Sequence, residues 1–200
     1  MSAQKRTYRM TRRAELEEQT RRRITESAVA LHQEIGPAQT SITAIAEHAG
    51  VRRSTVYRHF ADEDALFDAC SSHFRSLNPP PNLHAWSEIP DPRDRTETAL
   101  RELYAFYGRT HAMYERLFRD ETLVPALHRR LRDFHGYLQA AQDALMAGRK
   151  LRGRSASRPR AVIGHALAFT TWQSLIQEQQ LTDEDAVSLM SQLVENASRR

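Results

Sequence analysis

The stretch VRRSTVYRHF, residues 51–60, concentrates side chains that suit binding to phosphates and to the edges of bases. Arginine pairs with phosphate and can hold guanine through two hydrogen bonds, while tyrosine and other hydroxyl residues donate to phosphate oxygens. Three apolar residues, Val51, Val56 and Phe60, stand between the polar ones and predict that one side of the segment packs on a core. The competing interpretation is an exposed amphipathic helix whose charged face is only solvated, because short patterns of this kind give many false positives.

The residues before this stretch predict a second short helix and a tight turn. Thr40 or Ser41 can cap a helix over residues 42–49. Ala46 is the small residue that two closely crossing helices need, and Gly50 tolerates the positive φ of a turn. Two short helices joined in this way predict a helix-turn-helix, whose second helix would present its polar residues to the major groove.

Helical periodicity covers most of the remaining chain, and we find neither strand signals nor an internal repeat. Gly36-Pro37 stops the first helix, Asn78-Pro-Pro-Pro81 ends the fourth and forms a stiff linker, residues 82–92 look irregular, and Gly148 to Pro159 looks like a basic, mobile loop. The sequence therefore predicts an all-α fold of about nine helices. Helical spacing covers residues 12–35, 42–49, 53–60 and 62–77, returns in three stretches at 100–107, 113–118 and 123–145, and continues over 160–179 and 183–198.

Positive charge is concentrated near the N-terminus. The net charge is +4, and residues 1–60 contain eleven Lys or Arg residues against six Asp or Glu residues. This asymmetry predicts a polyanionic partner for the first third of the chain, either nucleic acid or an anionic membrane. The basic arm at residues 1–13 has two interpretations, insertion into the DNA minor groove or a solvated tail.

Several other classes of site find no support in the sequence. Cys70 is the only cysteine, which excludes an intrachain disulfide and argues against a cysteine-based zinc site. The nine histidines form no HExxH motif, and we find no GxSxG motif, no phosphate-binding glycine loop and no Cys–His pair. We therefore expect no metal, no cofactor and no catalytic activity. Without a signal peptide or a long apolar run, we expect a cytoplasmic, nucleoid-associated protein with no membrane partner.

Residues 40–60, TSITAIAEHAGVRRSTVYRHF, followed by Asp62 and by Ala65-Leu66-Phe67, allow a more specific interpretation. This stretch resembles the DNA-binding domain of tetracycline-repressor-like (TetR) transcriptional regulators, and the resemblance extends from about residue 20 to residue 70. It implies that Arg53, Ser54, Thr55 and Arg58 lie toward base edges. It also implies that the phosphate contacts come from Ser41, Thr43, Tyr57 and His59.

Two positions depart from the pattern of that family. Arg52 stands where these proteins commonly carry a serine that caps the recognition helix, so the cap is lost or moved while a cation is gained. Glu63, flanked by Asp62 and Asp64, stands where a lysine commonly touches the DNA backbone. Acids here complement the helix dipole but repel phosphate. We therefore include Arg52 among the DNA-binding residues and expect no DNA contact at Glu63.

The resemblance also implies a C-terminal domain that senses a small ligand and forms a dimer. An apolar or aromatic ligand would suit the aromatic residues and histidines of this half, although each of them could instead be a packed core residue. The candidate ligand-binding residues are Tyr104, Tyr107, His111, Tyr114, Phe118, Phe134, His135, His165, Phe169 and Trp172. The last two helices carry apolar residues on more than one face, which predicts a homodimer interface, with a monomeric core as the alternative.

The expected organisation therefore has four parts: a basic flexible arm (1–13), a helix-turn-helix DNA-binding domain (14–77), a Pro-rich linker (78–92) and a helical ligand-binding and dimerisation domain (93–200). The expected function is that of a ligand-responsive transcriptional regulator, a repressor that binds a palindromic operator as a homodimer. One alternative is an architectural or partner-regulated DNA-binding protein of the same fold without a small-molecule inducer. The other is an all-α enzyme with an incidental helix-turn-helix, for which we find no catalytic constellation.

Overall fold

The structure is a computed structural model that describes residues 3–149, 151 and 153–199, except for the side chains of residues 3–7, 9, 125, 126 and 154. Within these residues every regular element is helical, which confirms the all-α prediction. The chain divides into two compact units, and each is considered by itself. The first contains Met1–Asn78 and Glu115–Leu127, and the second contains Pro79–Tyr114 and His128–Arg200.

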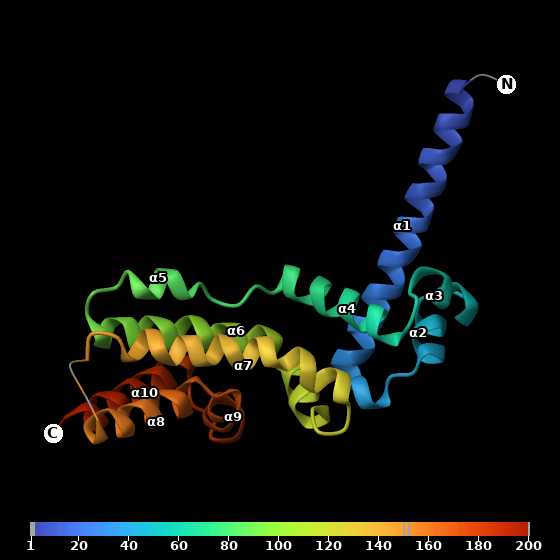
Figure 1. Ribbon diagram of the computed structural model, residues 1–200. Helices are drawn as coiled ribbons and strands as arrows, with labels where there is room; N and C mark the ends of the chain where they lie inside the picture. The colour runs from blue at the N-terminus through green and yellow to red at the C-terminus, as the bar shows by residue number, and fades with distance from the viewer. Residues whose placement is uncertain (1–2, 150, 152, 200) are drawn as a thin grey trace. The chain divides into compact units, whose positions relative to one another are not determined.

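The first unit consists of four N-terminal helices together with the end of α6, the start of α7 and the turn between them (Figure 1). Helix α1 packs against α2, α3 and α4, and α2 packs against α3. The elements of this unit are α1 (Ala3–Glu34), a 3-10 turn (Pro37–Gln39), α2 (Ile42–His48), α3 (Arg53–His59) and α4 (Glu63–Leu77).

The second unit contains the remaining helices, and in it α8 packs against α10. A turn of π-helix, Gln173–Glu178, directly follows α9. Its elements are α5 (Leu83–Ser87), most of α6 (Pro92–Asp120), most of α7 (Pro125–Met146), α8 (Arg154–Leu167), α9 (Phe169–Trp172) and α10 (Asp183–Ser198).

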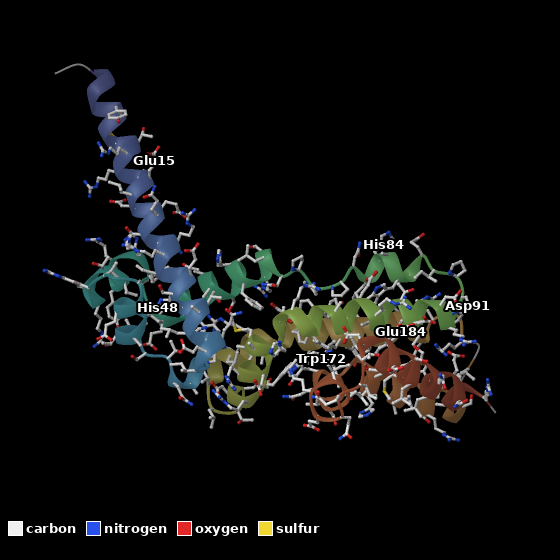
Figure 2. All side chains as sticks on the ribbon, turned by 180° about the vertical axis from the view of Figure 1, so that it is seen from behind. Glu15, His48, His84, Asp91, Trp172 and Glu184 are labelled. Atoms are coloured by element: carbon white, nitrogen blue, oxygen red, sulfur yellow. The ribbon has the colours of Figure 1, made fainter. Side chains whose placement is uncertain are left out.

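The N-terminal arm differs from its predicted form, because α1 is helical from Ala3 onward. No glycine or proline precedes Gly36, and the segment is rich in alanine, arginine, glutamate and glutamine, which favour helix. Two pairs at i, i+4 spacing, Arg13 with Glu17 and Arg22 with Glu26, add support on the surface. The described side chains of this half, residue 8 and residues 10–19, are exposed, as Glu15 illustrates in Figure 2.

Three further predictions about the loops were wrong. The segment 82–92 contains helix α5, whose first turn is capped by the Asn82 side chain accepting from the backbone N–H of His84. Helix α8 begins at Arg154 inside the predicted loop and contains Pro159 in its interior. The predicted helix over 160–179 is interrupted at Ala168, where the backbone is extended.

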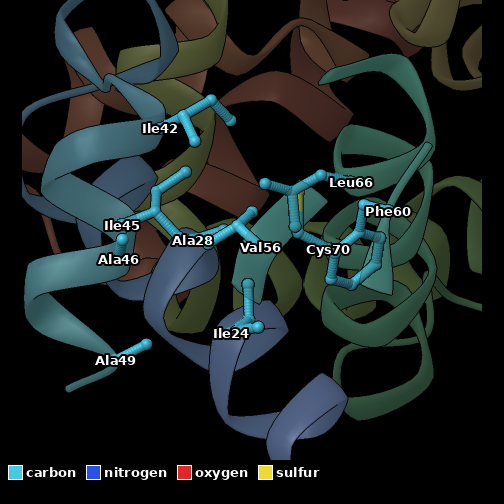
Figure 3. Close-up of a cluster of buried hydrophobic side chains, with 10 residues drawn as sticks. All are labelled: Ile24, Ala28, Ile42, Ile45, Ala46, Ala49, Val56, Phe60, Leu66 and Cys70. Carbon is cyan, nitrogen blue, oxygen red and sulfur yellow. The ribbon is translucent and has the colours of Figure 1, made fainter. Parts of the chain in front are cut away.

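A small apolar core holds α1 to α4 together (Figure 3). The side chains of Ile24 and Ala28 in α1 are fully buried. They meet the apolar sides of the three following helices, which is the arrangement that the helical spacing predicts. The other core residues are Ile42, Ile45, Ala46, Ala49, Val56, Phe60, Leu66 and Cys70.

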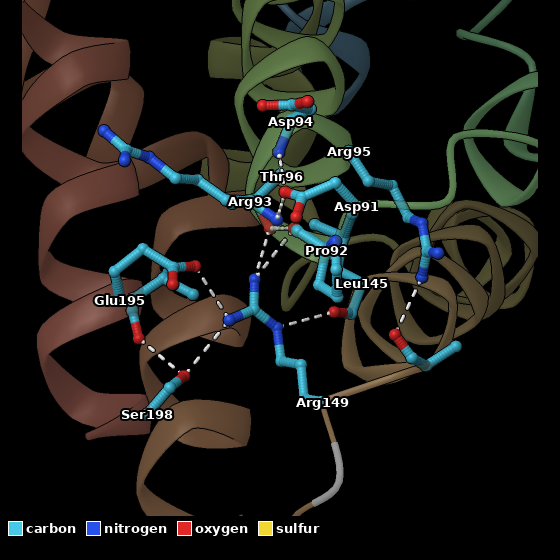
Figure 4. Close-up of polar contacts among 12 residues, drawn as sticks. Asp91, Pro92, Arg93, Asp94, Arg95, Thr96, Leu145, Arg149, Glu195 and Ser198 are labelled. Carbon is cyan, nitrogen blue, oxygen red and sulfur yellow. Dashed lines mark hydrogen bonds and ion pairs between the residues drawn. The ribbon is translucent and has the colours of Figure 1, made fainter.

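Two buried arginines join the ends of helices in the second unit (Figure 4). Arg149, just after α7, donates to Pro92 O and Thr96 Oγ1 at the start of α6 and pairs with Glu195 of α10 at 2.9 Å. Arg95 donates to the carbonyls of Ile89, Ala144 and Ala147. Carbonyls at the end of a helix lack internal partners, so the Arg95 guanidinium satisfies acceptors at the end of α7 that burial would otherwise leave unpaired.

Candidate nucleic-acid interface

Helices α2 and α3 form a helix-turn-helix whose turn depends on Gly50. Gly50 has φ 63°, a conformation that strains any residue with a Cβ atom. The turn is closed by a hydrogen bond from Val51 N to Ala46 O at 2.9 Å. Ser41 caps α2, its hydroxyl accepting from Ala44 N at 3.1 Å. Val56, 1% exposed, anchors α3 on the core.

The opposite side of α3 is polar and exposed. Within this unit it brings together most of the residues predicted from the sequence to contact DNA. Arg53 donates to the Tyr57 hydroxyl at 3.2 Å, and its guanidinium carbon lies 5.5 Å from the centre of the Tyr57 ring. The two side chains therefore support each other on the surface. The exposed members of the predicted set are Ser41, Thr43, Arg52, Arg53, Ser54, Tyr57 and Arg58.

Thr55 and His59 are less accessible, since both are half-buried. The Nε2 atom of His59 is enclosed and has no hydrogen-bond partner among the described residues. Burial, followed by the charges of Arg58 and Arg21, lowers the pKa of His59, while Glu17 and Glu18 oppose this shift. At neutral pH the ring is therefore uncharged, and a contact to phosphate would be a neutral hydrogen bond.

The N-terminus of α3 has no side-chain cap. Arg52 occupies the capping position in an extended conformation, and its side chain makes no capping hydrogen bond. At the next helix Asp62 does cap, accepting from Ala65 N at 2.7 Å. The structure thus confirms that the substitution by arginine leaves the recognition helix uncapped by a side chain, while its cation stays exposed.

Acidic residues lie close to these candidate phosphate contacts. A hollow of about 400 Å³ has Ser41, Thr43 and Arg53 in its lining together with Glu63 and Asp64. The hydrogen bond to Tyr57, and to a smaller extent the charge of Glu63, raise the pKa of the Arg53 guanidinium. The negative charge at Glu63 therefore acts directly on the part of the surface that would meet phosphate.

A polar joint, which the sequence did not reveal, fixes the turn between α1 and α2. Asp120, whose side chain is 2% exposed, accepts from Ala38 N at 2.9 Å and pairs with Arg119 at 2.7 Å. Arg119 also donates to Ile35 O at 2.8 Å. Gly36 has φ 92°, and a Cβ atom there would overlap Arg119 Nη2, so only glycine fits at this position.

His32 is buried near this joint, where its Nδ1 lies 3.7 Å from the Cys70 sulfur. Burial lowers the pKa of His32 to about 4, an effect that the nearby charge of Asp120 partly opposes. For Asp120 itself burial acts to raise the pKa, but the hydrogen bonds from Arg119 and Ala38 outweigh it and hold the pKa below its usual range. The joint thus contains a neutral imidazole beside an ionised carboxylate.

The structure brings several of the ten predicted ligand-binding residues together in the second unit. Aromatic rings cluster around Tyr107. The centre of its ring lies 5.3 Å from the ring centre of Phe169 and 6.0 Å from that of Trp172. Tyr114 and Phe134 belong to the same cluster, with Phe106, which the sequence did not single out. His135 and His165 are exposed, and Phe118 belongs to the other unit.

Two tyrosine hydroxyls explain the break between α8 and α9. Tyr104 donates to Ala166 O at 3.0 Å, and Tyr107 donates to Leu167 O at 2.7 Å. They satisfy carbonyls at the C-terminal end of α8, so the chain can turn at Ala168 without leaving buried acceptors unpaired. Burial raises the pKa of both tyrosines, which keeps them protonated donors.

Trp172, labelled in Figure 2, is 2% exposed, but its indole Nε1–H has no hydrogen-bond partner in the described part of the chain. Buried indole N–H groups normally find an acceptor. The ring of His111 is near, with 6.2 Å between the ring centres. This tryptophan is therefore the unsatisfied donor of the aromatic cluster.

Among the described residues, no group of three or more His, Cys, Asp or Glu side chains could hold a metal ion. No described helix is both long enough and apolar enough to cross a membrane.

Residues 24–70 match the family model of bacterial regulatory proteins, tetR family. No curated protein matches the chain. One similar structure is a TetR-like transcriptional regulator from Rhodococcus sp. RHA1, with 18% identity and a TM-score of 0.66 over 88% of this chain and 94% of that one. Another, a proposed fatty acid metabolism regulator from Clostridium perfringens, has 14% identity and a TM-score of 0.64 over 88% and 97%.

A TetR transcription regulator from Haloarcula marismortui has 15% identity and a TM-score of 0.58 over 90% of this chain and 97% of that one. At these identities the structural likeness shows a shared fold, and the family match identifies the N-terminal domain. The family match covers the helix-turn-helix described above, so the chain carries an N-terminal domain similar to that of bacterial regulatory proteins of the tetR family.

Proposed function

We propose that this protein is a ligand-responsive repressor that binds a palindromic operator as a homodimer. The observation that carries the proposal is the two-sided character of α3, which is anchored through Val56 and exposes arginines and hydroxyls on its other side. A helix of this kind fits the major groove. The proposed DNA-binding residues are Ser41, Thr43, Arg52, Arg53, Ser54, Thr55, Tyr57, Arg58 and His59.

Within this proposal the residues divide by chemistry. Arg53 and Arg58 bind base edges, assisted by the hydroxyls of Ser54 and Thr55, because arginine can bond guanine in bidentate fashion. The remaining polar residues bind phosphates, which fix the position of the protein but carry no sequence information. The N-terminal half of α1 adds positive charge, so the affinity for DNA should fall steeply with salt.

The homodimer is proposed to form through α8 and α10. Most apolar residues of these helices are buried within the protomer, but Leu189 and Leu193 of α10 are 46% and 41% exposed. They lie four residues apart, on one face of the helix. The neighbouring α8 contributes the small exposed side chain of Ala161, which permits close approach. A second copy covering this face would bury the two leucines around a two-fold axis.

The ligand is proposed to bind within the aromatic cluster around Trp172. The unpaired indole N–H supports a ligand that combines an apolar ring with one hydrogen-bond acceptor. The π-helical turn that follows supports a segment able to rearrange, because such turns are frequent at functional sites. Such a ligand shifts DNA affinity only to the extent that it binds one conformer more tightly than the other.

The experiment that tests the function is selection of bound sequences from a random DNA pool at fixed ionic strength. We expect an enriched palindrome whose half-sites are about one helical turn apart. Sedimentation of the complex should give two protein chains per site. Selection without any enriched sequence would overturn the proposal.

The ligand site is tested with two probes of matched shape, 1-indanone and indane, of which only the first has an acceptor. We expect 1-indanone to bind more tightly, by about 2- to 10-fold, as one neutral hydrogen bond allows. The variant Trp172→Phe should bind both probes equally. Equal binding of the two probes to the unchanged protein contradicts the proposed role of Trp172, and DNA release by an acceptor-bearing ligand distinguishes a regulator from an architectural protein.

A further inference from the structure

We propose that Arg21 of α1 is a positioning residue that fixes the C-terminal end of the recognition helix α3. This inference rests on the proposed function, since it concerns how α3 is presented to DNA. Arg21 does not itself belong to the proposed DNA-binding set. Its side chain reaches across 38 residues of sequence to bond the backbone of α3.

The recognition helix needs support from outside. It has only seven residues, and helices of this length are unstable alone because nucleation is costly. Its N-terminus lacks a side-chain cap at Arg52. Its last carbonyls have no partners within the helix. The side chains of α3 can therefore keep a fixed position only if another element fixes the orientation of the helix and its C-terminal end.

Arg21 meets this requirement with two contacts. Its Nη1 donates to the carbonyl of His59, the last residue of α3, at 2.5 Å. Its guanidinium carbon lies 4.2 Å from the centre of the Phe60 ring. Phe60 is 2% exposed, and its N–H bonds Val56 O at 2.9 Å, which closes the helix. The cation thus holds the helix end through both backbone and ring.

The backbone of α1 around Arg21 is held firmly in place. The carbonyl of Arg21 accepts from the Thr25 hydroxyl at 3.0 Å, and Ile24, three residues on, is fully buried in the core. Because α1 also packs against α4, the contact transmits the rigidity of this core to the end of α3. A positive charge at a helix C-terminus also interacts favourably with the helix dipole.

The neighbouring Arg22 provides a matched control. It is exposed, lies one position away on α1, and pairs with Glu26 at 3.6 Å. Removing its charge changes the electrostatics of α1 by the same amount as removing that of Arg21. It does not remove a bond to α3, because Arg22 makes none that the structure describes.

The experiment compares Arg21→Met, Arg21→Lys and Arg22→Met with the unchanged protein. The methionine retains the apolar stem but cannot donate, and the lysine keeps the charge without the fork of donors. Dissociation constants are measured for the selected operator and for random DNA over a range of salt concentrations. Amide exchange of residues 56–60 reports the order of the helix end.

We expect Arg21→Met to bind the operator about tenfold more weakly, with Arg21→Lys intermediate. Affinity for random DNA and the slope of affinity against salt should match those of Arg22→Met, because positioning affects sequence reading while phosphate contacts set the slope. Amides at the end of α3 should exchange faster in Arg21→Met, to a smaller extent in Arg21→Lys, and at the unchanged rate in Arg22→Met.

An unchanged operator affinity in Arg21→Met overturns the inference. So does a salt slope lower than that of Arg22→Met by about one, since it would identify Arg21 as a direct phosphate contact. If Arg21→Met does not fold, the inference is tested with Arg21→Lys alone. This variant must then bind the operator more weakly than the unchanged protein while binding random DNA equally well. If the unchanged protein selects no operator, the proposed function fails and Arg21 is not the cause.

Discussion

The helix-turn-helix and the aromatic cluster around Trp172 arrange polar and apolar groups in opposite ways. In α3 an apolar side is buried against α1 while arginines and hydroxyls face outward. In and beside the cluster the side chains of Tyr104, Tyr107 and Trp172 are buried together with their polar atoms. The first arrangement leaves its polar groups free for a large charged partner. The second ties the two tyrosine hydroxyls to carbonyls and leaves the Trp172 indole N–H without a partner among the described residues, which is the donor that the proposed ligand would use.

The comparison predicts that changes in the aromatic cluster mainly lower the free energy of unfolding, whereas changes on the exposed side of α3 mainly lower the affinity for DNA. Replacing Trp172 with alanine should destabilise the protein by about 3–5 kcal/mol, because it removes a buried aromatic ring and leaves a cavity. Urea unfolding followed by circular dichroism measures this change. A loss below about 1 kcal/mol would show that the cluster is not a packed core.

Acid and alkali should affect the two units separately. The folded pKa of His32 is lowered from 6.5 to about 4, so its contribution is present above pH 6.5 and is lost as the pH falls toward 4. The loss amounts to roughly 3 kcal/mol. Tyr104 and Tyr107 have raised pKa values, so their contribution persists to about pH 10, the ordinary tyrosine pKa, and is lost above it.

This pH dependence is measured as unfolding free energy from pH 4 to pH 7 in His32→Gln and in the exposed control His84→Gln. The first variant should flatten the acid side of the curve, because the group that takes up the proton on unfolding is gone. The second should leave the curve unchanged, since the His84 side chain is 82% exposed. A curve of the same slope in all three proteins contradicts the assignment to His32.

Changes on the exposed side of α3 should leave stability unchanged and reduce binding. Arg53→Ala should weaken operator binding by about 1–3 kcal/mol and relax base preference at one position. Its unfolding free energy should stay within about 0.5 kcal/mol of that of the unchanged protein. Arg132→Ala, on an exposed face of α7, serves as the control for loss of one charge. Equal operator binding by both variants would remove Arg53 from the interface.

The smallest effect is expected at Glu63, where an acid lies beside the candidate phosphate contacts. Glu63→Lys should strengthen DNA binding severalfold and raise the salt slope by about one, provided that the new cation reaches a phosphate. Glu63→Gln should strengthen binding less, since it removes repulsion without adding a contact. Salt titrations of both variants distinguish the two effects, and weaker binding of Glu63→Lys would show that the acid has a positive role.

The helix-turn-helix was predictable because its determinants lie within about twenty residues. Ala46, Gly50 and Val56 have local roles at fixed spacing, and the structure confirms the turn at Gly50 and the capping of α2 by Ser41. The break at Ala168 was not predictable, because it depends on hydroxyls from residues 60 and 62 positions away. The joint formed by Arg119 and Asp120 was hidden for the same reason, since its partners lie 82 and 84 positions away.

Helix boundaries near proline show a second limit. Pro159 suggested a loop, but α8 accommodates it in its second turn, where its missing N–H affects only the hydrogen bond to a residue near the helix start. Asn82 provided a cap signal for α5 that the surrounding prolines obscured. Proline content therefore predicted loops at two places where the local structure is helical.

The π-helical turn at Gln173–Glu178 also bears on how the chain tolerates changes in length. The backbone N–H of Gln179, the residue that follows the turn, bonds Ser174 O, five residues back. The turn therefore holds one residue more than an α-helical turn would. Deleting a single residue there would convert the turn to ordinary α-helix rather than break it. Helix α10 begins afresh at its own cap, Thr182, whose hydroxyl accepts from Asp185 N. A one-residue deletion is therefore more easily absorbed in this turn than inside any helix that surrounds it.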